Sequence, residues 1–71
     1  MYYFAHESRE DLVYRAACAV AEGEWEAGAS REQATMAGYC VTRTLMRDCP
    51  MRQKVEEAFL LRVAEIVVRA S

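Results

Sequence analysis

Proline and glycine are scarce in this chain of 71 residues, which contains one proline and three glycines. Because both residues interrupt regular elements, their scarcity excludes long irregular stretches. The chain also has no glycine-rich phosphate loop and no run of about 18 consecutive apolar residues, the length that a membrane-spanning helix needs. No basic stretch followed by an apolar stretch opens it, so we expect neither a signal peptide nor a membrane partner.

Residues for catalysis and metal binding are equally few. The chain has a single histidine, His6, and three cysteines, Cys18, Cys40 and Cys49. No two of these cysteines have the short spacing of a structural zinc site, which favours buried or half-buried free thiols. An odd number of cysteines does not suit a secreted disulfide framework, so we expect a cytoplasmic protein with reduced thiols. We expect no enzyme, no metal and no cofactor.

Basic residues do not dominate the chain, whose formal net charge is −2. A dedicated nucleic-acid binder needs a basic face for the phosphates, so this balance argues against that class. The charge is uneven along the sequence. Residues 1–29 hold six acidic and two basic residues, whereas residues 30–71 hold five acidic and seven basic residues. The two halves can attract each other within one chain or between two copies.

Apolar residues at helical spacing are what the chain does have, and 54 % of it is hydrophobic. Ser8 and Asp11 resemble a capping box, which predicts a first helix from about Arg9 to about Ala27, ended by Gly28. Ser30 and Gln33 form a second box, which predicts a helix from Arg31 to about Arg47. The predicted core stripes of these helices are Leu12, Ala16, Ala19 and Val20, then Ala34, Ala37, Val41 and Leu45.

A third and longest helix is predicted between Pro50 and Ala70, with Asp48 as its cap. Its stripe is Val55, Phe59, Val63, Ile66 and Ala70. The sequence therefore predicts an all-α fold and a single helical domain over residues 1–71: three helices, in a helical hairpin or small bundle that dimerisation completes. Residues 1–7 are predicted to form a mobile or docking arm with an apolar tip of Tyr2, Tyr3 and Phe4.

Self-association is predicted because Leu60, Leu61 and Val67 lie outside the stripe of the third helix. A domain of this length buries too little surface to be more than marginally stable alone. A homodimer whose interface contains Phe59, Leu60, Leu61, Val63 and Val67 would supply the missing core. A different protein could cover the same surface, and the sequence does not decide between the two.

Trp25 and its acidic neighbours Glu22, Glu24 and Glu26 are the predicted partner-binding residues, together with Tyr2, Tyr3 and Phe4. An exposed tryptophan among charges is a typical interface anchor. The alternative is that Trp25 folds back over the core, and the sequence favours neither.

Gln33 to Arg47 supports a second hypothesis, that of a small DNA-binding regulator. Ala34 and Gly38 have the spacing found in the turn of a helix-turn-helix motif. Arg31, Thr42, Arg43 and Arg47 would then face DNA. Gly38 is equally explained by close packing of two helices.

In size and composition, although in no motif, the chain resembles the small acidic accessory proteins of phages, plasmids and bacterial regulatory systems. Such proteins commonly inhibit or redirect a larger protein by occupying its surface. The resemblance implies a regulator or inhibitor that acts by surface binding to a protein partner of unknown identity. DNA binding by residues 31–47 is the alternative function.

Overall fold

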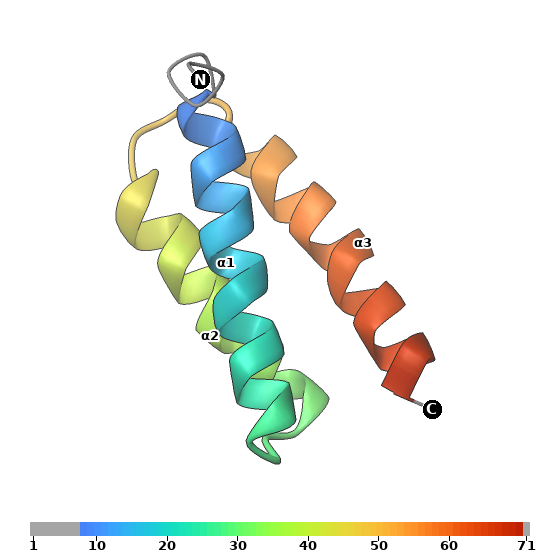
Figure 1. Cartoon of the computed structure of the whole chain (residues 1–71). Helices are drawn as coiled ribbons and strands as arrows, with labels where there is room; N and C mark the ends of the chain where they lie inside the picture. Colours follow the sequence, from blue (N-terminus) through green and yellow to red (C-terminus); the bar gives the residue numbers. More distant parts are fainter. Residues whose placement is uncertain (1–7, 71) are drawn as a thin grey trace, which may run out of the picture.

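The computed structural model describes residues 8–70, and within them the chain forms three α-helices and no strand (Figure 1). The helices are α1 (Arg9–Glu26), α2 (Arg31–Leu45) and α3 (Arg52–Ala70). Short connections reverse the chain twice, so α1 and α3 run in the same direction and α2 runs against both (Figure 1). The all-α prediction is confirmed for these residues. The predicted arm with Tyr2, Tyr3 and Phe4 lies outside the described residues, as does His6.

The predicted ends of α1 are confirmed in detail. The Ser8 hydroxyl accepts a hydrogen bond from the Asp11 backbone N–H at 3.2 Å. At the other end, the Gly28 N–H donates to the Trp25 carbonyl and the Ala29 N–H donates to the Glu24 carbonyl. This bond pattern is a Schellman motif, and it requires a left-handed residue, which Gly28 supplies with φ of 99°.

The second capping box is complete, whereas the predicted cap of the third helix is wrong. The Ser30 hydroxyl accepts from the Gln33 N–H at 3.1 Å, and the Gln33 side chain accepts from the Ser30 N–H at 3.0 Å. Helix α2 ends at Leu45, before the predicted Arg47, and α3 begins only at Arg52. Asp48 lies in the intervening turns, where the Arg52 N–H donates to the Cys49 carbonyl. The chain therefore reverses over residues 46–51, which lie between the two helices.

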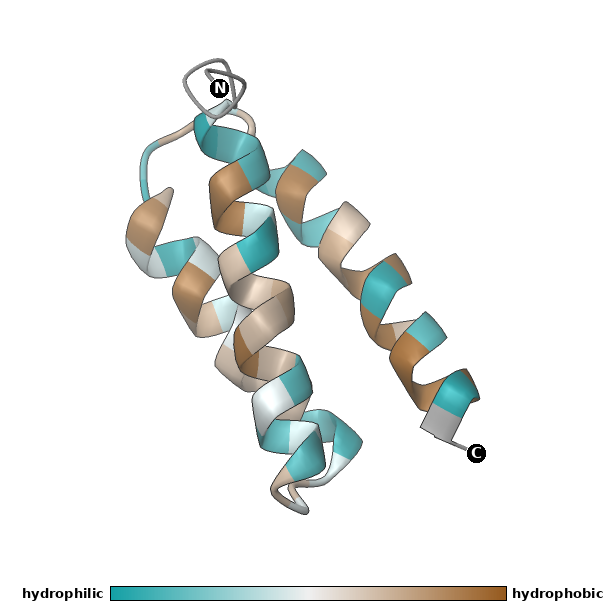
Figure 2. Cartoon of the chain, in the orientation of Figure 1, coloured by the Kyte–Doolittle hydropathy of each residue, from teal (hydrophilic) through white to brown (hydrophobic). Residues whose placement is uncertain are grey.

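The core stripe predicted for α3 is confirmed at Val55, Phe59, Val63 and Ile66, which are all buried, while the side chain of Ala70 lies outside the described part of the chain. The stripe predicted for α1 is wrong. Its buried residues are Val13, Ala17, Cys18 and Ala21, while Leu12 is 52 % exposed and Val20 is also exposed. Helix α1 contacts both other helices. Small residues on its buried face allow that close approach. Figure 2 shows that much of the middle of α1 is only moderately hydrophobic.

The buried face of α2 is also rotated from the predicted one. Ala34, Gly38 and Thr42 are its buried residues, and Leu45 is exposed. The ring of Phe59 in α3 occupies the space above Gly38, so this position of α2 must carry no side chain. Figure 2 shows the strongly hydrophobic residues of the chain concentrated along α3. No helix within residues 8–70 combines the length and the apolar character needed to cross a bilayer.

Candidate protein-binding surfaces

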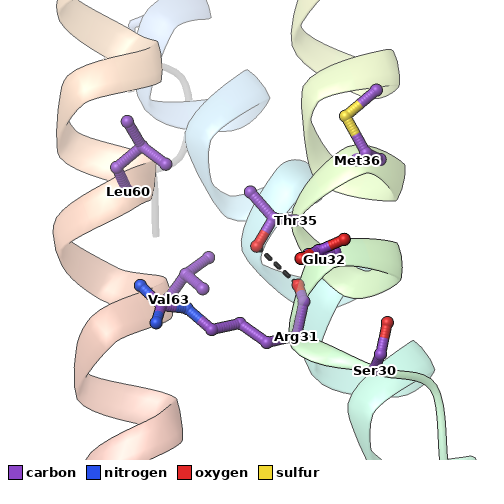
Figure 3. Close-up of a pocket in the computed structure, with 7 residues that line it drawn as sticks. All are labelled: Ser30, Arg31, Glu32, Thr35, Met36, Leu60 and Val63. Atoms are coloured by element: carbon purple, nitrogen blue, oxygen red, sulfur yellow. Dashed lines mark hydrogen bonds between the residues drawn. The ribbon is translucent and has the colours of Figure 1, made fainter.

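An open groove of about 730 Å³ runs along the junction of α2 and α3 (Figure 3). Met36 of α2 and Leu60 of α3 are its apolar walls, and they are 54 % and 41 % exposed. Val63 lies deeper, and the Arg31 side chain extends toward it across the lower end of the groove (Figure 3). Ser30, Glu32 and Thr35 complete the lining. The groove therefore combines an apolar centre with a rim that carries one positive and one negative charge.

Trp25 lies half-buried at the end of α1 and packs against the core cluster of Ala17, Ala21 and Phe59. It borders a shallow depression together with Glu22, Glu26, Ile66 and Arg69. Trp25 therefore folds back over the core with part of its side chain. Its remaining exposed edge is available to a partner.

The three glutamates around Trp25 do not form one patch. Glu22 is half-buried and its Oε1 lies 3.3 Å from Nη2 of Arg62, whose Nη1 lies 3.2 Å from Glu65. The hydrogen bond to Glu65, with the charge of Glu22 added, raises the pKa of Arg62. Glu24 and Glu26 are exposed. Glu22 is thus committed to linking α1 with α3, and only Glu24 and Glu26 present free acidic surface.

The predicted dimer residues separate into buried and exposed sets. Phe59 is fully buried and Val63 is 5 % exposed, so both belong to the core of the single chain. Val67 is half-buried against that core. Leu60 and Leu61 are exposed as predicted, and Leu61 is 70 % exposed. Of the predicted interface residues, Leu60 and Leu61 are therefore the most accessible to a second chain.

The residues of the DNA-binding alternative do not form a free basic surface. Thr42 is fully buried, and its hydroxyl donates to the Gly38 carbonyl of its own helix at 3.3 Å. Thr42 therefore cannot face DNA in this fold. Arg43 lies over the Tyr39 ring and pairs with Glu56, its Nε 3.5 Å from Oε2. Arg31 and Arg47 are exposed, and Arg31 lines the groove between α2 and α3.

The three cysteines differ in exposure. Cys18 is buried, Cys49 is half-buried and Cys40 is exposed, and all three are free thiols. Burial raises the pKa of Cys18, and burial also raises the pKa of neighbouring Tyr14. Within residues 8–70 no group of three histidine, cysteine or carboxylate side chains could hold a metal ion.

The predictions from the sequence give no role to three exposed apolar residues, Met36, Met51 and Val68. Met36 is 54 % exposed and Val68 is 73 % exposed. Val68 follows Leu61 by seven residues, so the helical period already contained the signal that the two share a face. No sequence pattern indicates that Met36 lines a groove, because the groove depends on where α3 packs.

The chain matches no protein family, no curated protein and no solved structure.

Proposed function

We propose that this protein regulates or inhibits a larger protein by binding to its surface, and that the groove between α2 and α3 is the contact. The observation that carries the proposal is the pair of exposed apolar walls, Met36 and Leu60, which face an open groove. Apolar side chains that line a groove typically accept the apolar face of a partner helix. Methionine suits such a role because its flexible side chain adapts to the shape of the partner.

The rim of the groove supports the same function. Arg31 and Glu32 offer one charge of each sign at its edge. Charged rims contribute more to the rate and specificity of association than to its strength. The free energy of binding is therefore expected to come mainly from Met36 and Leu60. Self-association through the exposed side of α3 is the second part of the proposal, since Leu61 and Val68 remain uncovered in the single chain.

The test compares two variants that add one charge to an exposed apolar position. Met36→Glu alters the groove, and Leu12→Glu alters a similarly exposed residue of α1. Tagged wild-type protein and both variants are used to isolate partners from the native host, and each captured protein is then purified and titrated. We expect the partner to bind wild-type protein and Leu12→Glu equally. Met36→Glu is expected to weaken binding by about 2 kcal/mol or more, as at an interface hot spot.

A partner that binds Met36→Glu as tightly as wild-type protein would remove the groove from the proposal. Regulation is tested separately, by measuring the activity of the purified partner with and without this protein. A partner whose activity does not change on saturation would contradict a regulatory role.

DNA binding is not proposed as a second function. Thr42 is buried and Arg43 is paired with Glu56, so no observation in residues 8–70 favours it.

A further inference from the structure

Helix α3 carries a second stripe of residues, which faces away from the core. Its members follow one another at alternating steps of three and four residues: Met51, which immediately precedes the helix, then Lys54, Ala58, Leu61, Glu65 and Val68. All six are exposed, and Leu61 and Val68 are the most exposed large apolar residues described. Alternating steps of three and four are the spacing of a coiled-coil seam.

We propose that a second copy of this chain covers this stripe, with the two α3 helices antiparallel and the two-fold axis passing between positions 59 and 60. This inference rests on the self-association in the proposed function. It adds which face of α3 is covered, the relative direction of the two α3 helices and the register of their residues. In this register Lys54 lies opposite Glu65 of the second copy, Met51 opposite Val68, and Ala58 opposite Leu61. Two-fold symmetry makes each of these pairs occur twice.

The two charges in the stripe identify the occupant. Lys54 and Glu65 lie at equal distances from the proposed axis, so an antiparallel copy brings opposite charges together at both places. A parallel pair in register would instead place Lys54 against Lys54 and Glu65 against Glu65, which is unfavourable. Glu65 keeps its ion pair with Arg62 of its own chain, but a purely apolar helix from another protein would offer neither Lys54 nor Glu65 an opposite charge across the contact.

The surface beside the stripe favours the same arrangement. Glu10 and Asp11 of α1 lie next to its first half, in a depression that they share with Met51, Lys54 and Ala58. An antiparallel second copy brings the last turn of its own α3, which carries Arg69, to this acidic surface. Leu60 is outside the contact, because it lines the groove on the side of α2. The dimer therefore leaves the groove open for a partner.

Charge reversal tests the register. Lys54→Glu and Glu65→Lys each place like charges opposite each other twice per dimer, and the double variant restores both opposite pairs across the axis. Sedimentation equilibrium is measured for the full chain, and circular dichroism checks that each variant stays helical. Glu24→Lys, a charge reversal at an exposed position of α1, is the matched control.

We expect wild-type protein and Glu24→Lys to sediment as dimers. Each single variant at positions 54 and 65 should weaken self-association about tenfold, and the double variant should recover it. A monomeric wild-type protein would overturn the inference, and so would single variants that dimerise normally. If the single variants weaken the dimer and the double variant does not restore it, the proposed antiparallel register is contradicted. Partner binding through the groove is tested separately, by the titration of the Met36→Glu variant. A failure of the proposed groove contact is therefore distinguishable from all of these sedimentation outcomes.

Discussion

The ring of Phe59 lies where residue 38 would carry a side chain. A β-carbon added to Gly38 would come within 3.0 Å of three atoms of that ring. Phe59 is fully buried and packs edge-on against Tyr39, with ring centroids 5.7 Å apart. The contact between α2 and α3 therefore depends on a glycine facing an aromatic ring, and neither residue can change size without moving a helix.

Gly38→Ala is expected to lower the free energy of unfolding. The added methyl group overpacks the core, which typically destabilises a protein by about 1–3 kcal/mol, more than the gain of roughly 1 kcal/mol in helix propensity. Gly23→Ala is the matched control, because a β-carbon there would meet nothing within 4 Å. It should stabilise the protein by about 0.5–1 kcal/mol. Urea titrations followed by circular dichroism measure both changes, and equal effects of the two substitutions would contradict the Phe59 contact.

Trp25→Ala should lower stability as well as any binding in which its exposed edge takes part. Trp25 is half-buried against the core cluster, so we expect a loss of roughly 1.5–3 kcal/mol, below the ~3–5 kcal/mol of a fully buried aromatic residue. Thermal unfolding measures the change, with Glu26→Ala as a control at an exposed neighbouring position. A Trp25→Ala protein that unfolds at the wild-type temperature would show that the ring is not part of the packed structure.

Stability is expected to fall at alkaline pH because of Cys18 and Tyr14. Burial raises the pKa of both groups, so the folded chain holds these protons more tightly than the unfolded chain does. Their contribution is complete below the ordinary thiol pKa of about 8.5 and is lost as the pH rises through the raised values. Urea unfolding at a series of pH values above neutrality should therefore show falling midpoints.

Two substitutions test whether Cys18 and Tyr14 cause this loss of stability at alkaline pH. Cys18→Ala should remove the part that begins near the ordinary thiol pKa, and Tyr14→Phe should remove part of the loss at higher pH. Cys40→Ala, at the exposed cysteine, is the control and should keep the wild-type pH dependence. If Cys18→Ala keeps the wild-type profile, the buried thiol is not the source of the loss.

The sequence by itself determined where α1 and α2 begin and how α1 ends. Ser8, Gly28 and Ser30 act through hydrogen bonds or backbone angles within a few residues, so their effect does not depend on the rest of the fold. The inward face of α3 was also determined locally. Its large apolar residues recur at one helical spacing, and only one side of the helix can bury Phe59 with Val55 and Val63.

Only the tertiary structure decided which faces of α1 and α2 are buried. Both helices contain small residues on several sides, so apolar spacing alone selected Leu12 and Leu45, which are exposed. The choice depends on how closely helices approach: Phe59 needs the space above Gly38, and α1 needs Ala17 and Ala21 inward to contact two neighbours. The groove between Met36 and Leu60 follows from the same packing, because its walls belong to helices that meet only in the folded chain.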